Sequence, residues 1–190
     1  MITAQRITTT DAALYRFMER VLVESFPPEE RRSLSALRRI TDEQASVFHL
    51  YIVLDGDLPV GFYNYWLFSG FCYAEHLAIA PEYRNRKYGT QLITSLTSRF
   101  SLPLVIEVEP PASEITCRRI GFYERLGFRL WQRDYLQPPY SPEHDFLPLK
   151  LMSFREIDLS DDEIYHHVCS SIYQEVYGYR GECKRSHFDL

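Results

Sequence analysis

Cationic side chains gather where a predicted strand gives way to a predicted helix. In the stretch LAIAPEYRNRKYGTQLITSL, Arg84, Arg86 and Lys87 precede a helical pattern. The first turn of a helix exposes unpaired N–H groups and the positive end of its dipole, and both favour anions. Gly89 allows the backbone to approach a ligand closely. The pattern predicts an anion site that suits a pyrophosphate, and the alternative is that these side chains only coat a solvated turn.

The chain as a whole is acidic, so the basic segment is a local feature. It has 190 residues, a formal charge of −5 and a pI of about 5.7. This balance argues against bulk electrostatic binding to nucleic acid or to an anionic membrane. No window approaches the ~20 apolar residues of a membrane span. The first residues, MITAQRITTTDAALY, lack the apolar core of a signal peptide. We therefore expect a cytoplasmic protein that binds neither nucleic acid nor membrane.

A loose group of metal-ligating residue types lies near the C-terminus. His166, His167 and Cys169 are followed by Cys183 and His187. This spacing matches no common structural zinc site. The four cysteines form no CxxC pair, which favours reduced thiols. We predict that the chain holds no metal.

The elements that must position the basic turn follow from apolar periodicity. The first half predicts a helix that is capped by Thr10 or Asp11 and ends near residue 25, and a second helix over 28–40. Two β-rich runs flank residues 55–59 and predict a hairpin. The run 71–80 is a third strand. It leads to the basic turn and then to a helix whose apolar residues, Leu92, Ile93, Leu96 and Phe100, recur at helical spacing.

The second half predicts a strand over 102–109, a helix over 114–128 that Gly127 terminates, and two last strands over 128–136 and 147–154. This mixed order of helices and strands predicts an α/β or α+β domain with three layers around a central sheet.

A last helix follows the final strand. Ser160 and Glu163 form a capping box, and an apolar stripe then recurs every four residues. We predict a domain over residues 1–155 and a C-terminal helical extension with its tail over 156–190. The stripe consists of Ile164, Val168, Ile172 and Val176, and we expect it to pack on the domain or on a second subunit.

Three stretches together resemble the GNAT superfamily of acetyl-CoA-dependent N-acetyltransferases. HLAIAPEYRNRKYGTQL is similar to the family's strand, its P-x-Y-R turn and its [RQ]-x-x-G-x-[GA] loop, with Lys87 in place of the first glycine. VIEVEPP is similar to the next strand, and IGFYERLGF to the helix that carries a tyrosine before a GF pair. The resemblance implies a GNAT-like mixed, mostly antiparallel central sheet flanked by helices, to which the C-terminal helix is appended.

The resemblance also implies where acetyl-CoA binds. The backbone of Leu77, Ala78 and Ile79 would pair with the pantetheine arm like a neighbouring strand. Many members carry an asparagine seven residues before the helix tyrosine; here the residue is Thr116, so that cofactor contact is altered. The segment that would hold the pyrophosphate comprises Arg84, Asn85, Arg86, Lys87, Tyr88, Gly89 and Thr90.

Acetyl transfer to an amine needs an acid for the departing thiolate and an acceptor for the amine proton. By resemblance Tyr123 lies near the thioester sulfur and also contacts the cofactor. A phenol has a pKa of about 10 and stays protonated at neutral pH, so it can donate. Glu75 is the first choice for the base, and Glu107 and Glu109 on the next strand are alternatives. His76 is expected on the opposite face of the strand from Glu75.

The resemblance therefore implies an enzyme that moves an acetyl group from acetyl-CoA to a primary amine, on a small molecule or a peptide, by direct attack. A non-catalytic acyl-CoA-binding sensor or docking module of the same fold is the alternative, and the additional C-terminal helix gives it weight. Whether the chain forms a homodimer is left open.

Overall fold

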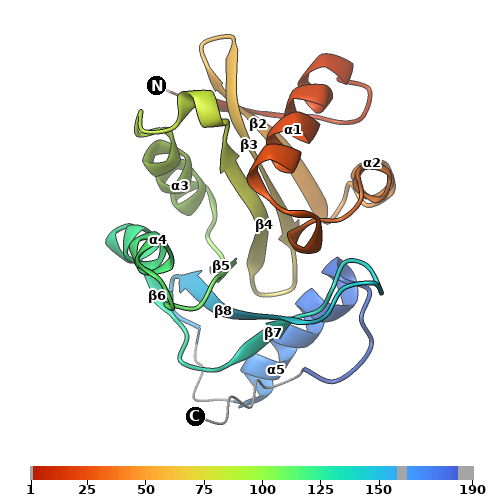
Figure 1. Cartoon of the computed structure of the whole chain (residues 1–190), viewed down its shortest axis with the longest axis vertical. Helices are drawn as coiled ribbons and strands as arrows, with labels where there is room; N and C mark the ends of the chain where they lie inside the picture. Colours follow the sequence, from red (N-terminus) through yellow and green to blue (C-terminus); the bar gives the residue numbers. More distant parts are fainter. Residues whose placement is uncertain (1, 158–161, 184–190) are drawn as a thin grey trace. The chain divides into compact units, whose positions relative to one another are not determined.

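The structure is a computed structural model that describes residues 2–157 and 162–183 (Figure 1). The chain divides into two compact units. The first unit comprises Met1–Leu67 and Ala74–Phe100, and the second comprises Phe68–Tyr73 and Ser101–Leu190.

The strands of the first unit follow one another in the order β1, β2, β3 and β4. β2 (Phe48–Asp55) and β3 (Leu58–Leu67) form the predicted antiparallel hairpin, and β4 (Cys72–Ile79) contributes its residues from Ala74 onward. The sequence analysis missed β1 (Ile2–Arg6), which pairs antiparallel with β2. Most β1 side chains are exposed, so the strand shows no apolar alternation, and its backbone pairing alone defines it.

The helices of this unit are α1 (Ala12–Ser25), α2 (Leu34–Glu43) and α3 (Tyr88–Arg99). In Figure 1, α1 lies across the hairpin strands. The predicted second helix over 28–40 was wrong in its first half. A single 3₁₀ turn at Pro28–Glu30 is followed by extended backbone, and α2 begins only after Ser33, whose hydroxyl caps the Ala36 N–H at 3.2 Å.

The second unit is built around β8 (Leu147–Phe154), which pairs antiparallel with β5 (Leu104–Val108), β6 (Phe128–Leu130) and β7 (Tyr135–Gln137). The predicted strand over 128–136 is therefore two short strands. They pair with opposite ends of β8. The buried Trp131, directly after β6, donates its indole N–H to the Ser153 hydroxyl at 3.0 Å. α4 (Glu114–Arg125) follows β5 and ends before Gly127, which has a positive φ of 91°.

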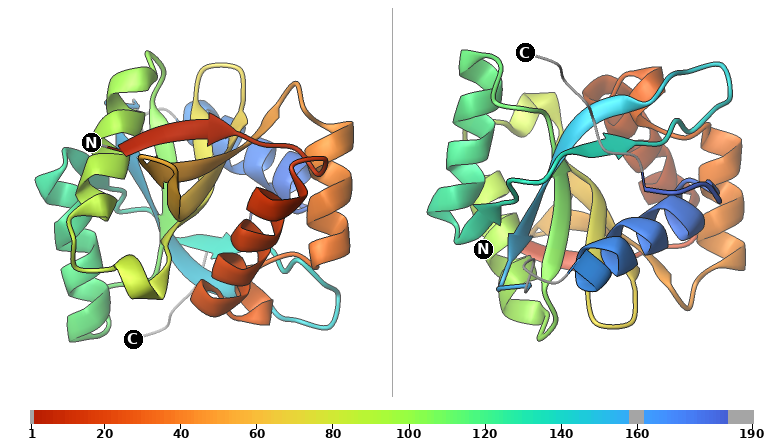
Figure 2. Two further views of the ribbon diagram at one scale, coloured as in Figure 1. Left: turned by 90° about the horizontal axis from the view of Figure 1, so that it is seen from above. Right: turned by 90° about the horizontal axis from the view of Figure 1, so that it is seen from below.

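The predicted C-terminal helix is present. α5 (Asp162–Ser171) continues into a π-helical turn at Ile172–Val176, and the right-hand view of Figure 2 shows the two as one rod. Val168, Ile172 and Val176 of the predicted stripe are buried. The Tyr165 hydroxyl donates to the Asp134 carbonyl at 2.7 Å, so the helix packs on its own chain. Ser160 of the predicted capping box lies outside the described residues.

These pairings confirm the predicted fold class, with antiparallel strands, flanking helices and a helix after the last strand. The division into residues 1–155 and 156–190 remains a prediction. In the described part of the chain, every helix is too short or too polar to cross a membrane.

Candidate active site

The turn before α3 has a constrained backbone. Lys87 is the N-cap of the helix and has φ 63°, and Asn85 has φ 64°. Left-handed backbone costs free energy in any residue other than glycine, and it is concentrated at ligand-binding turns. Lys87 occupies the position of the family's first glycine. It adopts a conformation that glycine favours, so the lysine is accommodated without loss of the tight turn.

Two side chains of this turn fix it to the rest of the first unit. Arg84 donates from Nε to the Ile79 carbonyl and from Nη2 to the Ser25 hydroxyl, both at 3.1 Å. The Tyr88 hydroxyl donates to Asp55 Oδ2 at 2.6 Å, and this bond raises the pKa of Tyr88. Arg84 therefore ties the turn to the end of β4, and Tyr88 ties the start of α3 to the hairpin.

The remaining predicted phosphate ligands point outward. Arg86 and Lys87 are exposed, and the Arg86 guanidinium lies 5.6 Å from the centroid of the Tyr83 ring. Thr90 is exposed and Gly89 half-buried in the first turn of α3. Two cations and the free N–H groups of a helix N-terminus form a donor set that suits a diphosphate. The role of these residues in binding pyrophosphate remains a prediction.

The predicted pantetheine strand lies close to β3. Ala78 is buried, and Leu77 and Ile79 are half-buried. A Cβ atom added to Gly61 of β3 would lie 2.4 Å from the Ala78 carbonyl oxygen. The close approach of the two backbones therefore requires glycine at position 61.

Glu75 is enclosed within the first unit. Its side chain is 0% exposed and accepts from Arg32 Nη2 at 2.5 Å and from the Trp66 indole N–H at 2.9 Å. Burial raises the pKa of Glu75, but the Arg32 charge, His76 and the two hydrogen bonds outweigh it and leave the pKa below its usual value. The carboxylate is therefore held ionised by its partners, and its predicted role as base stays untested.

His76 is also buried, with its own set of partners. Nδ1 lies 3.4 Å from the Asn64 amide nitrogen, and Nε2 lies 3.1 Å from the Glu30 carbonyl oxygen. Burial lowers the pKa of His76. A neutral imidazole that donates to Glu30 fits this geometry, and it ties β4 to the 3₁₀ turn.

Glu107 on β5 and Glu109 directly after that strand differ in their surroundings. Glu109 forms an ion pair with Arg119 at the surface. Glu107, on β5, is half-buried and accepts two phenol hydrogen bonds, from Tyr135 at 2.5 Å and from Tyr177 at 2.7 Å.

α4 carries the last two predicted site residues. Thr116 completes a capping box with Ser113, in which the Ser113 N–H donates to the Thr116 hydroxyl at 3.0 Å. Tyr123 is half-buried, and its ring contacts Phe128 edge-on with the centroids 5.4 Å apart. Burial raises the pKa of Tyr123, so its phenol stays protonated at neutral pH. Among the described residues, its hydroxyl is not engaged in a hydrogen bond.

The sequence analysis did not single out Arg32, Tyr135 or Tyr177. Arg32 follows a proline-rich turn, and Tyr177 directly precedes Gly178, where a helix is expected to end. The proline-rich turn and Gly178 predict where a helix begins or ends. No pattern in the sequence shows that Arg32 contacts Glu75 or that Tyr135 and Tyr177 contact Glu107.

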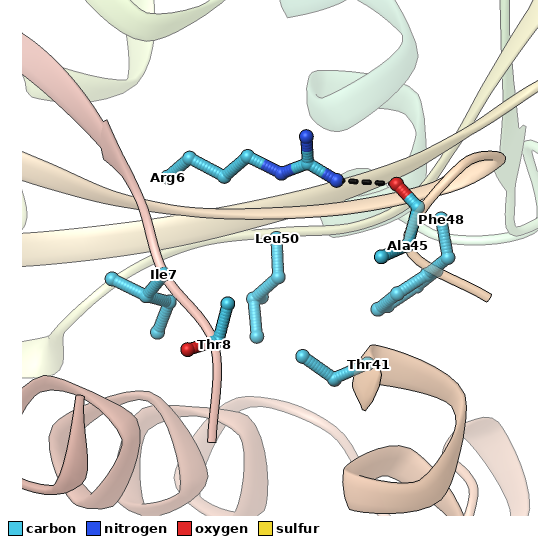
Figure 3. Close-up of a pocket in the computed structure, with 7 residues that line it drawn as sticks. All are labelled: Arg6, Ile7, Thr8, Thr41, Ala45, Phe48 and Leu50. Atoms are coloured by element: carbon cyan, nitrogen blue, oxygen red, sulfur yellow. Dashed lines mark hydrogen bonds between the residues drawn. The ribbon is translucent and has the colours of Figure 1, made fainter. Parts of the chain in front are cut away.

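A pocket of the first unit lies apart from these residues. It has a volume of about 330 Å³ and is bounded by β1, the end of α2 and β2 (Figure 3). Arg6 donates to the Ala45 carbonyl at 2.5 Å beside it, and Phe48 and Leu50 contribute apolar side chains to its lining. The predicted site residues do not line it, so we do not assign it to acetyl transfer. No group of three metal-ligating side chains forms within 2–157 and 162–183; His187 lies beyond those ranges.

Three comparisons with known proteins bear on the site. Residues 46–130 match the family model described as "Acetyltransferase (GNAT) domain". A Bacteroides thetaiotaomicron protein assigned to the GNAT family of acetyltransferases is 46% identical in sequence. Its structure matches with a TM-score of 0.89 over 94% of this chain and 99% of that chain.

More distant matches agree with this result. YjbC of Bacillus subtilis, assigned as an acetyltransferase, is 21% identical over 168 residues, which cover 85% of this chain and 81% of YjbC. The ribosomal-protein-S18-alanine N-acetyltransferase of Escherichia coli is 19% identical, with a TM-score of 0.55 over 85% of this chain and 99% of that chain. At this identity the second match shows the fold alone.

Proposed function

This chain belongs to the GNAT family of acetyltransferases, and from that premise we propose that it transfers the acetyl group of acetyl-CoA to a primary amine. The observation that carries the proposal is the turn at 84–90. It combines two left-handed residues, a helix N-terminus and exposed cations at the positions that match the family's pyrophosphate loop. Backbone N–H groups and cations suit a diphosphate.

We assign the cofactor contacts as the family match implies. The backbone of Leu77–Ile79 pairs with the pantetheine arm, and Arg84–Thr90 hold the pyrophosphate. Arg86 and Lys87 supply positive charge, while Arg84 acts chiefly on the shape of the turn, because its guanidinium is already bonded to Ile79 and Ser25. Thr116 contributes little, since its hydroxyl is used to cap α4.

The chemistry that we propose is direct attack. The neutral amine adds to the thioester carbonyl, the C–S bond breaks, and Tyr123 donates its phenol proton to the departing sulfur. A tyrosine with a raised pKa and a hydroxyl that is not engaged by described residues suits this role.

Two glutamates are the candidates for the base, Glu75 and Glu107. To take a proton, Glu75 would have to release Arg32, and separating a buried ion pair leaves an uncompensated charge. Glu75 therefore supports the architecture of β4 better than it supports proton transfer. Glu107 is bonded to neutral phenols that can share a proton, which favours it over Glu75.

We further propose a small-molecule or peptide amine as the acceptor, a cytoplasmic location, and no binding to nucleic acid or membrane. The Escherichia coli relative acts on an alanine of a ribosomal protein, as its name states. That precedent places a peptide amine in the first panel to be tested.

The decisive experiment has two arms. Calorimetry with acetyl-CoA measures binding, and release of the coenzyme A thiol in the presence of small-molecule and peptide amines measures transfer. We expect binding, and turnover with at least one amine. Tight binding without turnover on any amine would favour the sensor alternative, and no binding would refute the proposed function altogether.

A further inference from the structure

Two tyrosine hydroxyls bind Glu107 in the second unit, and the hydroxyl of a third tyrosine contacts one of them. Tyr135 of β7 donates to Glu107 Oε1 at 2.5 Å, and Tyr177 donates to Oε2 at 2.7 Å. The Tyr73 hydroxyl, from the start of β4, lies 3.2 Å from that of Tyr177. Each oxygen of the Glu107 carboxylate therefore has its own phenol donor. One of these donors, Tyr177, is in turn in hydrogen-bond contact with the Tyr73 hydroxyl.

The direction of the hydrogen bonds follows from chemistry. An ionised carboxylate only accepts, so the Tyr177 proton points toward Glu107. The Tyr177 oxygen is then free to act as an acceptor, and Tyr73 must be the donor between the two. The result is an ordered chain that runs from Tyr73 through Tyr177 to Glu107.

The surroundings keep these phenols protonated. Tyr73 and Tyr135 are 0% exposed, and burial and then the Glu107 charge raise the pKa of Tyr135 and of Tyr177 far above the usual value. Burial chiefly, then Cys183 and to a smaller extent the Glu107 charge, raise the pKa of the Cys169 thiol on α5. The groups shown to face Glu107 from β4, β7, α5 and the end of the C-terminal segment are thus neutral donors or a neutral thiol.

Tyr177 belongs to the C-terminal segment, here Asp162–Tyr177. That segment is fixed by its own contacts, because the Tyr173 hydroxyl donates to the Leu136 carbonyl on β7 and Tyr165 donates to the Asp134 carbonyl. These contacts hold the segment in place, so its last residue, Tyr177, has a fixed position relative to Glu107. A helix needed only for packing could end in any residue, whereas this one ends in a donor to a carboxylate.

We propose that Glu107 accepts the proton of the acceptor amine, and that Tyr177 of the C-terminal segment positions its carboxylate. This proposal rests on the proposed acetyl transfer. An ammonium group gives one proton to Glu107 and becomes the attacking amine. After the C–S bond breaks, the second amine proton replaces the one that Tyr123 gives to sulfur. Glu107 then releases its proton to water. Glu107 is thus a catalytic residue and Tyr177 a positioning residue.

The kinetic test compares four variants on an amine that the wild-type protein acetylates. Glu107→Gln should lower kcat about 10²-fold or more, with the calorimetric affinity for acetyl-CoA unchanged. Tyr177→Phe should move the acidic limb of the kcat/KM profile to higher pH by about one unit, because the charged form of Glu107 loses a donor. Tyr73→Phe should shift the limb less, in the same direction. Tyr179→Phe removes a hydroxyl two residues further on and is the matched control.

A second readout does not depend on turnover. With ¹³C-labelled glutamate carboxyl groups, the Glu107 resonance is assigned by its absence in Glu107→Gln and followed against pH. The titration midpoint should rise in Tyr177→Phe and stay at the wild-type value in Tyr179→Phe. A Tyr177 that serves packing alone would lower the melting temperature and leave both the midpoint and the acidic limb in place, and that result overturns its positioning role.

The outcomes separate the two proposals. Wild-type turnover by Glu107→Gln refutes the base role and leaves acetyl transfer intact. A wild-type protein that acetylates no amine refutes the proposed function, and with it the base role, while the carboxyl titration still decides whether Tyr177 acts on Glu107.

Discussion

At the scale of single residues, Tyr123 is the most direct test of the proposed chemistry. Tyr123→Phe keeps the ring and its contact with Phe128 but removes the donor to sulfur. We expect kcat to fall about 10²-fold, the common effect of losing a general acid, with little change in KM for acetyl-CoA. Steady-state kinetics under conditions where chemistry limits the rate measure this. A Phe variant that matches the wild-type rate would reduce Tyr123 to a packing residue.

Arg32 gives a residue-scale prediction about stability. Arg32→Met leaves the Glu75 charge buried without the two hydrogen bonds that Arg32 donates, and breaking a buried pair in this way costs about 3–5 kcal/mol. Urea denaturation at pH 7 measures the loss. Arg38→Met is the control, because its ion pair with Glu19 lies at the surface. If the two substitutions lowered the free energy of unfolding equally, the buried pair would be no more stabilising than the surface pair.

The same pair predicts a pH dependence. The folded pKa of Glu75 lies below its unfolded value. Its contribution to stability is therefore complete above the unfolded pKa of about 4.3 and is lost as pH falls through the lower folded value. The destabilisation caused by Arg32→Met should accordingly shrink in acid. Denaturation curves of both proteins between neutral pH and pH 3 measure the difference.

At the scale of elements, the spacing between β3 and β4 depends on Gly61. Gly61→Ala would place a methyl group 2.4 Å from the Ala78 carbonyl oxygen, so the strand that carries Leu77–Ile79 must shift. Overpacking of this kind costs about 1–3 kcal/mol, and acetyl-CoA affinity should fall with stability. In the control Gly121→Ala, the new atom meets only the end of a flexible arginine at 3.4 Å. If both alanines behave like the wild type, the two backbones are not constrained there.

The elements also show what the sequence could predict. Runs with strong apolar periodicity, such as β2, β3, α3 and the C-terminal helix, were predicted correctly. β1 was missed because its side chains are exposed and its partner strand lies far along the chain. The helix over 28–40 was predicted too long because local propensity does not reveal that Arg32 extends to reach Glu75. The surroundings of Glu107 were equally hidden, because its donors come from residues 28 and 70 positions away.

At the scale of the whole molecule, the C-terminal segment belongs to the core of the second unit. It buries Tyr165, Val168, Cys169, Ile172, Tyr173 and Val176. A large side chain contributes about 1.5–3 kcal/mol on burial, and a domain is stable by only about 5–15 kcal/mol. We expect a chain that ends at residue 157 to lose cooperative unfolding, as followed by circular dichroism. A cooperative transition near the wild-type temperature would instead support an independent domain over 1–155.

The π-helical turn at Ile172–Val176 determines the direction in which the side chains after it point around the helix axis. Each residue of an α-helix turns the next side chain by about 100°, and a π-turn accommodates an extra residue, which offsets that rotation for everything beyond it. Tyr177 is the first residue after the turn. Deleting the exposed Gln174 should restore the α-helical period and still bring the Tyr177 hydroxyl to Glu107, whereas the same residues wound as a regular α-helix would turn it away. The wide winding of this turn, with its additional residue absorbed, therefore sets the azimuth at which Tyr177 meets the carboxylate.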